Sequence, residues 1–341
     1  MLMLAGMVGL LAISGIAFMG DAGEDDADID VQSDPLETPN IEPITIGDDD
    51  DFPSDNTSGC EIPGDAQNQI LSGDGLDNAI MGGLGDDQIN GYGGDDVVWG
   101  DGGDDTLHGG DGNDVINGGD DRDILHGDDG EDILNGDADD DQLFGHDDDD
   151  TLNGGDGQDK LVGGQGDDTL LGDDGDDTLH GDLGDDRLDG GDGRDTLFGG
   201  WGDDWISGVE EGPLDPDAAA DSQSDFLNGG GGDDMILAGQ SDIVTAGAGN
   251  DTIVLNEQIG NGEAVTLMDF NADEDRLLMV CDLTGDTEPT VEITTDSDVP
   301  GISHIMINGV EIASVHTDDK LNIDDIVLVD FADAPALQLN V

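Results

Sequence analysis

One period governs the middle of this chain. Large aliphatic residues recur every nine positions without a gap, at Ile80, Ile89, Val98, Leu107, Ile116, Leu125, Leu134, Leu143, Leu152, Leu161, Leu170, Leu179, Leu188, Leu197 and Ile206. A glycine stands seven residues before each of these fifteen, and an aspartate stands two residues before each except the first, which has Asn78. A period held this long indicates a repeat architecture in which each unit packs on its neighbours.

The repeating unit reads G-G-x-G-x-D-x-U-x, where U is the aliphatic residue. Complete copies of its glycine-rich loop occupy residues 82–87, 109–114, 163–168 and 190–195. We expect each unit to turn sharply at its glycines, which adopt positive φ readily, and then to form a strand of three residues. The middle residue of that strand would face inward, so that two units complete one coil of 18 residues.

Residues 18 positions apart would stack on successive coils, about 4.8 Å apart. The aspartates fall into two such columns. One column is Asp87, Asp105, Asp123, Asp141, Asp159, Asp177 and Asp195, and the other is Asp96, Asp114, Asp132, Asp150, Asp168, Asp186 and Asp204. At an effective dielectric of ~20, neighbouring unit charges at this spacing repel by roughly 3.5 kcal/mol. The columns need a counter-ion, and the cation that takes ~6–8 hard oxygen ligands in flexible geometry is Ca²⁺ rather than Mg²⁺.

These in-phase loops resemble the RTX (hemolysin-type) calcium-binding nonapeptide repeat, and the resemblance spans residues 71–255. It implies a parallel β-roll in which each Ca²⁺ lies between two loops on consecutive coils. The implied metal ligands are the two aspartate columns, Asp234, Asp251 and the loop glycines Gly82, Gly85, Gly109, Gly112, Gly163, Gly166, Gly190 and Gly193.

Some loops depart from the pattern. Leu76, Asp121, Asp139 and Asp148 replace the third loop glycine. Aspartate tolerates a left-handed backbone better than most residues, so these turns can survive. Calcium ligation is a weaker expectation at Asp123, Asp141 and Asp150, and the neutral Asn78 predicts weak or no binding in the first loop.

The charge of the chain limits its partners. It has 87 acidic and 6 basic side chains and a formal net charge of -81. Nucleic-acid binding through phosphates needs cations, so it is excluded, and attachment to anionic membrane surfaces is disfavoured. Self-repulsion of this size opposes a compact state, so we expect the metal-free chain to be disordered and to fold as it binds calcium.

The fold class predicted is all-β, a parallel β-roll solenoid with a small antiparallel β domain capping its C-terminal end. Strands are expected at 264–267, 275–280, 290–294 and 326–331, with a hairpin over 305–312 on the Asn308-Gly309 turn. The expected organisation is an apolar signal peptide or membrane anchor (1–20), an acidic disordered linker (21–64), the roll (65–208), an inserted loop (209–224), further repeats (225–255) and a C-terminal capping and secretion region (256–341).

The resemblance also implies export, by type I secretion, to an extracellular location, with membrane contact only through residues 1–20 if they are uncleaved. Cys60 and Cys281 lie at opposite ends of the coil, and at ~4.8 Å per coil they are too far apart for the ~7 Å Cα separation of a disulfide unless the C-terminal domain folds back along the roll.

No catalytic signature accompanies the repeats, because neither H-E-x-x-H nor G-x-S-x-G occurs. We therefore interpret the chain as non-catalytic. Two alternatives stay open: a calcium-dependent adhesin or matrix protein that binds polysaccharide or cell surfaces, and an accessory module of a polysaccharide-modifying enzyme. His108, His126 and His180 are interpreted as exposed strand-edge residues rather than metal ligands. Surface packing is favoured over sugar stacking for Trp99, Trp201, Trp205, Phe144 and Phe198.

Overall fold

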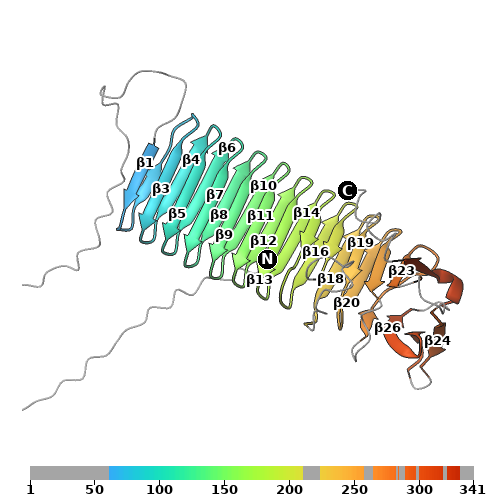
Figure 1. Cartoon of the computed structure of the whole chain (residues 1–341). Coiled ribbons are helices and arrows are strands. Elements are labelled where there is room, and N and C mark those ends of the chain that lie inside the picture. Colours follow the sequence, from blue (N-terminus) through green and yellow to red (C-terminus); the bar gives the residue numbers. More distant parts are fainter. Residues whose placement is uncertain are drawn as a thin grey trace, which may run out of the picture. The chain divides into compact units, whose positions relative to one another are not determined.

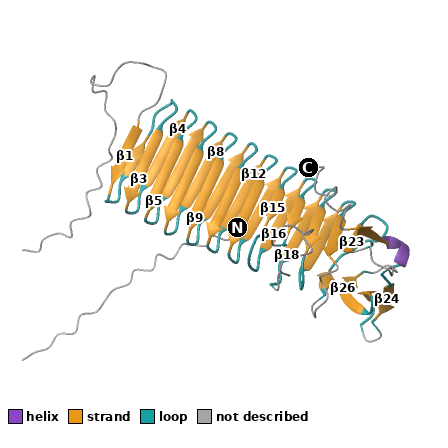
Figure 2. Cartoon of the chain, in the orientation of Figure 1, coloured by secondary structure: helices purple, strands orange, loops and turns teal. Residues whose placement is uncertain are grey.

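The computed structural model describes residues 61–209, 223–256, 264–281, 283, 289–296, 299–317 and 321–330 of the 341-residue chain. Two sheets face each other along the repeat region, with loops along both edges (Figures 1 and 2). Successive strands alternate between the sheets. The expected segment 1–20, most of the expected linker and Cys60 lie outside the described residues.

The first sheet contains the odd-numbered strands. Its order is β1 (Glu61–Asp65), β3 (Ala79–Leu84), β5 (Val97–Gly102), β7 (Val115–Asp120), β9 (Ile133–Ala138), β11 (Thr151–Asp156), β13 (Thr169–Asp174), β15 (Arg187–Asp189), β17 (Trp205–Ser207), β19 (Met235–Ala238), β21 (Thr252–Asn256), β23 (Arg276–Cys281) and β27 (Ile326–Asp330). All of its pairings are parallel, and β1 already begins within the last residues of the expected linker.

The second sheet contains the even-numbered strands and a C-terminal addition. Its order is β2 (Ile70–Ser72), β4 (Gln88–Gly93), β6 (Thr106–Asp111), β8 (Ile124–Asp129), β10 (Gln142–Asp147), β12 (Lys160–Gln165), β14 (Thr178–Leu183), β16 (Thr196–Trp201), β18 (Phe226–Gly231), β20 (Ile243–Ala248), β22 (Val265–Leu267), β26 (Val310–His316), β25 (Ile302–Ile307) and β24 (Val291–Thr295). Strand β26 joins β22 in parallel, whereas β24, β25 and β26 pair antiparallel.

The predicted stacking of residues 18 apart is confirmed by the strand register. Leu143 pairs with both Leu125 and Leu161 in one sheet, and Leu152 pairs with both Leu134 and Leu170 in the other. The step lengthens to 30 where Thr196 pairs with Phe226, and it shortens to 17 where Phe226 pairs with Ile243. The strand register therefore resumes at Phe226, and residues 210–222 lie outside the described ranges.

The core is formed by one aliphatic residue per unit. Fourteen of the fifteen predicted residues, from Ile80 to Ile206, are 0% exposed, and the remaining one, Ile89, is 2% exposed. They meet between the two sheets in one cluster that continues into the C-terminal strands. The sheets are thus held together by aliphatic side chains, while their outer faces carry polar and aromatic ones.

The repeat strands are longer than predicted. Most span six residues rather than three, because each strand continues beyond the predicted three residues through the first three positions of the next loop. Burial alternates along each strand, as in β6, where Leu107 and Gly109 both face inward. The first glycine of each unit is therefore an inward-facing strand residue.

At the C-terminal end, the coil gains irregular structure. The Asn308-Gly309 turn joins β25 to β26, and both of its residues have positive φ, 52° and 80°, as a tight two-residue hairpin requires. A single turn of 3₁₀ helix, η1 (Ile323–Asp325), leads into β27. No helix among the described residues has the length and apolar character needed to cross a membrane.

Candidate metal-binding turns

The structure places the predicted aspartates in two ordered columns along the edges of the roll. Every one of them, from Asp87 to Asp251, is between 0 and 3% exposed. One carboxylate oxygen of each, Oδ1, accepts the backbone N–H of the corresponding residue one coil earlier. For example, Asp105 Oδ1 accepts from Asp87 N at 2.7 Å, and Asp123 Oδ1 accepts from Asp105 N at 2.8 Å. Each carboxylate therefore ties its own coil to the preceding one.

The second carboxylate oxygen, Oδ2, points into the loop and has a different environment. In fifteen of the described columnar aspartates this oxygen is buried with no hydrogen-bond partner: Asp87, Asp96, Asp105, Asp114, Asp123, Asp132, Asp141, Asp150, Asp159, Asp168, Asp177, Asp186, Asp204, Asp234 and Asp251. A buried carboxylate oxygen without a partner is costly. A row of such oxygens indicates that a cation belongs beside them.

The first glycine of each unit leaves room beside that oxygen. A Cβ atom on Gly82 would lie 2.7 Å from Asp87 Oδ2 and 2.8 Å from the carbonyl oxygen of Gly100, one coil further on. Gly82 does not have positive φ, unlike Gly85 at 109°. The first glycine is thus required for space and the later ones for backbone conformation. Its space brings a carboxylate and a carbonyl oxygen from consecutive coils together, which suits a hard cation.

Three columnar aspartates lie beyond the sequence-predicted set. Asp225 Oδ1 accepts from Asp195 N, Asp242 Oδ1 from Asp225 N, and Asp275 Oδ1 from Asp251 N, at 2.8, 3.0 and 3.3 Å. The sequence Asp225-Phe226-Leu227 and its counterparts have the D-x-U pattern of the repeat. They were missed because the spacings to the preceding columnar residue, 30, 17 and 24, differ from the regular spacing of 18.

The irregular loops keep the turn. Asp121, Asp139 and Asp148 have φ of 75°, 74° and 76°, as predicted for replacements of the third glycine. Leu76 does not have positive φ. The second glycine is replaced in the same way, by Tyr92, Asp101, Asp128, Asp137, His146, Asp173 and Asp182, a substitution pattern that sequence reasoning missed.

The first loop closes around an amide. Asn78 is 4% exposed, and its side-chain oxygen accepts the backbone N–H of Asp74 at 2.7 Å. Its own N–H donates to Asp96 Oδ1 at 2.6 Å. Asn78 therefore continues the column without adding a negative charge.

Burial raises the pKa of the columnar carboxyls well above the ordinary value of 3.8. Desolvation is the largest cause, the backbone N–H bond opposes it, and neighbouring carboxylates add to it. The pKa is raised to about 8 at Asp141, Asp150, Asp177 and Asp204, to about 7 at Asp105, Asp123, Asp132, Asp186 and Asp234, and to about 6 at Asp96, Asp114, Asp159, Asp168 and Asp251. Without a cation, burial therefore shifts the columnar carboxyls of the folded chain toward their protonated form.

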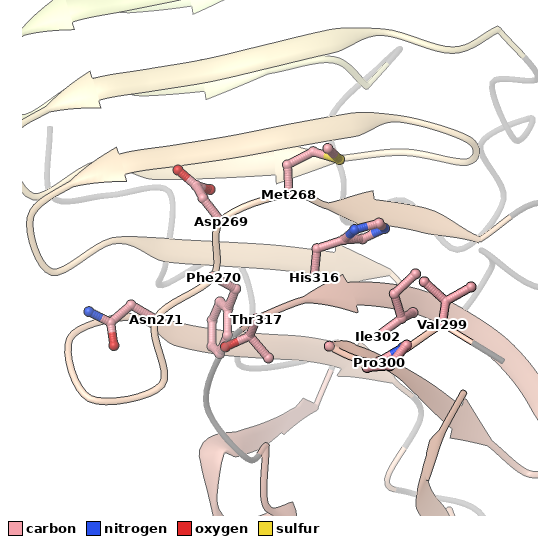
Figure 3. Close-up of a pocket in the computed structure, with 10 residues that line it drawn as sticks. Met268, Asp269, Phe270, Asn271, Val299, Pro300, Ile302, His316 and Thr317 are labelled. Atoms are coloured by element: carbon pink, nitrogen blue, oxygen red, sulfur yellow. The ribbon is translucent and has the colours of Figure 1, made fainter. Parts of the chain in front are cut away.

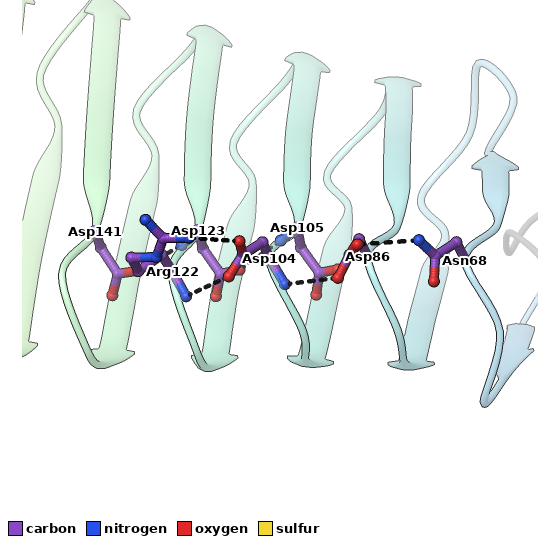
Figure 4. Close-up of polar contacts among 7 residues, drawn as sticks. All are labelled: Asn68, Asp86, Asp104, Asp105, Arg122, Asp123 and Asp141. Carbon is purple, nitrogen blue, oxygen red and sulfur yellow. Dashed lines mark hydrogen bonds and ion pairs between the residues drawn. The ribbon is translucent and has the colours of Figure 1, made fainter. Parts of the chain in front are cut away.

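An outer row of exposed side chains runs beside each buried column, one residue earlier in each loop. Asp86 accepts from Asn68 Nδ2 at 3.0 Å and from the backbone N–H of Asp104 at 3.3 Å. Asp104 accepts in turn from the side chain of Arg122 at 2.8 Å (Figure 4). On the opposite edge, the row is acidic over five coils, at Asp149, Asp167, Asp185, Asp203 and Asp233. The Asp-Asp pairs of the loops thus divide into a buried and a solvent-facing carboxylate.

Most ligands at these turns must come from the backbone. Within the described ranges, no three His, Cys, Asp or Glu side chains already surround a common point. One columnar carboxylate per loop, joined by loop carbonyls, is the donor set that the turns offer. This all-oxygen set favours Ca²⁺ over a transition metal.

The geometry defines a parallel β-roll with carboxylate-lined turns, and the comparisons agree with it. The chain matches the family model of the RTX calcium-binding nonapeptide repeat in overlapping segments over residues 72–208 and again over 219–241. The repeat region belongs to this RTX family, whose repeats bind several calcium ions.

Comparisons with curated proteins and with solved structures give no further information about function. No curated protein matches the chain by sequence. Among solved structures, the extracellular lipase LipA from Serratia marcescens matches at 15% identity with a TM-score of 0.20, over 69% of this chain and 45% of the lipase. The chain thus spans less than half of the lipase's length, and a likeness at this score supports no argument about activity.

A separate cavity of about 570 Å³ lies at the C-terminal end of the roll, lined by Met268, Asp269, Phe270, His316 and neighbouring residues (Figure 3). Its carboxylate, Asp269, accepts the backbone N–H groups of Ala246 and Gly247 at 2.8 and 3.1 Å. These bonds hold the segment after β22 against the preceding coil, so Asp269 has a structural role.

Substitution of one buried aspartate should weaken calcium binding more than substitution of its exposed neighbour. Asp168→Asn replaces the unpartnered Oδ2 by an amide nitrogen, which repels a cation. We expect a higher half-saturating calcium concentration and a calcium-loaded roll destabilised by roughly 1–3 kcal/mol. Asp167→Asn, with the same charge change in the same loop, is the matched control. Calcium titration calorimetry and urea unfolding would measure both, and equal effects would contradict the assignment of Asp168.

Acid should partly replace calcium. Because the folded pKa values lie above 3.8, protonation stabilises the cation-free roll; this stability is complete below pH ~3.8 and is lost as the pH rises through 6 to 8. In chelator, far-UV circular dichroism should therefore show β structure gained between pH 8 and pH 5. High salt at pH 8 is the control, since it screens exposed charges but not burial. An equal gain with salt would mean that surface repulsion, not the buried columns, unfolds the chain.

Proposed function

We propose that this chain is an exported, non-catalytic calcium-binding β-roll that folds when it binds calcium. The observation that carries the proposal is the set of fifteen buried Oδ2 atoms without partners in two columns. A chain with a formal net charge of -81 has few cations of its own to neutralise them. The ion must come from outside, and binding is then coupled to folding.

The chain's own residues prepare each turn. Oδ1 of a columnar aspartate is fixed by the backbone N–H of the previous coil, which orients Oδ2 toward the loop. The first glycine leaves space there, and the glycine carbonyl of the next coil faces the same space. The proposed ligands are the predicted columnar aspartates with Asp225, and loop carbonyls including those of the predicted glycines. Asp242 and Asp275 continue the columns, but Oδ2 of each already accepts a backbone N–H, from Gly239 at 2.6 Å and from Asn271 at 2.7 Å. Bound calcium would supply the positive charge that allows these carboxylates to remain ionised.

Export would use this coupling of folding to calcium binding. In a cytosol poor in calcium, the acidic chain would stay unfolded, and it would fold in calcium-rich surroundings. The apolar stretch 1–20 supports a signal or anchor, and the region after residue 256 supports a cap with a secretion role, as the sequence predicts. The proposed organisation keeps the acidic linker between the apolar stretch and the roll, and the inserted loop at 209–224.

A calcium titration followed by far-UV circular dichroism tests this proposal. We expect a cooperative gain of β signal with calcium and little or none with equimolar magnesium, because Mg²⁺ needs octahedral geometry and releases water reluctantly. The protein should lose the signal again when a chelator is added. A chain already fully folded in chelator at pH 7.5 would refute coupled folding and the export mechanism that depends on it.

One observation favours an additional adhesive role on the second sheet. A groove of about 420 Å³ crosses its outer face, lined by Phe144, Val162, Leu183 and Trp201 with polar neighbours. Trp201 is 72% exposed and Leu183 49%. An exposed indole suits stacking on a sugar ring, and the charge of the chain favours a neutral polysaccharide over an anionic one.

Cosedimentation with cellulose or chitin in the presence of calcium would test the adhesive role. Trp201→Ala should abolish binding, because it removes the flat ring of the groove. Tyr92→Ala removes another exposed aromatic side chain, 59% exposed, at a distant coil of the same sheet and is the matched control. Wild-type protein that fails to sediment with either polymer would contradict the role.

A further inference from the structure

The outer face of the first sheet carries a long strip without charge. Two columns of outward side chains cross strands β3, β5, β7, β9, β11 and β13, which follow one another in the sheet (Figure 1). The first column is Ala79, Val97, Val115, Ile133, Thr151 and Thr169. The second column is Met81, Trp99, Asn117, Asn135, Asn153 and Leu171. No residue of this uncharged strip is ionisable, in a chain with a formal net charge of -81.

Charged residues mark both ends of the uncharged strip. On β1, Glu61 occupies the first column. On β15, Arg187 and Asp189 occupy the two columns directly after the strip and form an ion pair of 3.5 Å. The strip is therefore a bounded surface of six strands.

The strip is open to solvent, whereas the same columns are covered further along the sheet. Ile133 is 45% exposed and Met81 is 38% exposed. Beyond β15 the columns become apolar again, and there Trp205, Leu237 and Val254 are only 2–5% exposed within one cluster. Apolar side chains of this face are thus buried near its C-terminal end and left open over β3–β13. An open apolar patch of this extent is typical of an interaction surface.

We infer that the uncharged strip is the contact face between two copies of this chain. Other surfaces of the roll bring like charges together when two copies meet, which is costly. The loop edges carry rows of exposed carboxylates such as Asp167 and Asp185, and the outer face of the second sheet carries Asp128 and Asp182. A two-fold axis places the same patch on both partners, so the strip meets a second strip that is equally free of charge.

The composition of the strip suits this contact. Aromatic residues and methionine, here Trp99 and Met81, are enriched in the core of protein interfaces, whereas aspartate, glutamate and lysine are depleted. The central asparagines form a row in which Asn135 Nδ2 donates to Asn117 Oδ1 at 3.0 Å, and Asn117 Nδ2 donates to the carbonyl oxygen of Val98 at 3.4 Å. An amide side chain has two donor hydrogens and an acceptor oxygen, so a row of amides can pair with an identical row.

A neighbouring column of the first sheet limits the strength of the contact. It alternates glycine with the exposed Asp101, Asp137 and Asp173, so successive carboxylates lie two coils apart. That separation is ~10 Å at ~4.8 Å per coil, somewhat beyond the ~8 Å screening length at physiological salt. The remaining repulsion between copies is screened further by added salt, which should therefore strengthen the dimer.

The size of the strip predicts a weak dimer. Six strands at ~4.8 Å and two outward columns at ~7 Å give a patch of about 400 Å² on each copy. About 800 Å² buried in total lies below the range of stable interfaces and matches a transient association. Only the folded roll presents the strip, so the inference rests on the calcium-coupled folding that we propose.

Sedimentation equilibrium of the full chain in saturating calcium tests the contact. We expect a monomer–dimer equilibrium that shifts toward the dimer at higher protein concentration and as salt is raised from about 0.05 to about 0.5 M. Ile133→Glu places a carboxylate within the strip and should weaken the dimer by at least roughly tenfold. Ile243→Glu is the matched control, because Ile243 also begins its strand and is 38% exposed but lies on β20 of the second sheet. It should leave the dimer unchanged.

Circular dichroism in calcium would first establish that each variant is folded. A folded wild type that stays monomeric at every concentration and at both salt levels would overturn the dimer, as would equal weakening by Ile243→Glu. A folded monomer that cosediments with cellulose or chitin, and loses this binding in Ile133→Glu, would assign the strip to a polysaccharide and also overturn the dimer. Failure to gain β structure with calcium would contradict the proposed function, whereas a folded monomer contradicts only the contact between copies.

Discussion

The burial of negative charge is the constraint on which the rest of this structure depends. Each coil buries two carboxylates, and each carboxylate has one oxygen fixed by a backbone N–H and one directed into its loop. The aliphatic core contributes only one side chain per unit, so it offers little hydrophobic gain for each residue ordered. Neutralisation of these carboxylates, either by protons, as their raised pKa values indicate, or by a bound cation, removes the unfavourable term of burying their charge. The calcium-coupled folding that we propose rests on this property of the columns.

The burial of carboxylates also explains the pattern of glycines in the repeat. The first glycine of each unit is present in all fifteen units because a Cβ there would occupy the space between a carboxylate and the carbonyl of the next coil, as at Gly82. The second and third glycines are less strict, since aspartate, tyrosine or histidine adopts the same positive φ at several loops, including those of Tyr92 and Asp121. In the later unit of Asp251, the small residue Ala246 takes this first position. Invariance within the fifteen in-phase units therefore marks the position that leaves room beside the carboxylate Oδ2.

Much of this arrangement could be predicted from the period alone. The 18-residue coil, the buried aliphatic residues and the two aspartate columns all follow from a side chain that alternates in direction along a strand. The six-residue strands and the role of the first glycine could not be predicted, because both depend on how consecutive coils approach each other. Asp225, Asp242 and Asp275 were not predicted, because an insertion and two changes in the number of residues per coil interrupt the nine-residue period before them. The strand register places them in the columns. The outer carboxylates could not be separated from the buried ones without knowing which of two adjacent residues faces the loop interior.

The loops at the edges of the roll and the outer faces of its sheets differ in how freely their residues can vary. A binding site particular to one chain is therefore expected on the outer faces. At the edges, the first glycine is kept in all fifteen in-phase units, and the columnar aspartate is kept in all but the first. On the faces, the residues on either side of each aliphatic position point outward and are not needed by the fold, so they vary from coil to coil: threonine, glutamine, lysine, histidine and phenylalanine all occur on the second sheet. Because the 18-residue register places outward residues of successive coils side by side, two or three substitutions suffice to build a local site. The stacked rings around His126 and the groove beside Trp201 are each built on a few adjacent strands. The regular edges repeat the donor geometry of the turns, and the variable outer face carries the groove to which we assign the proposed adhesive role.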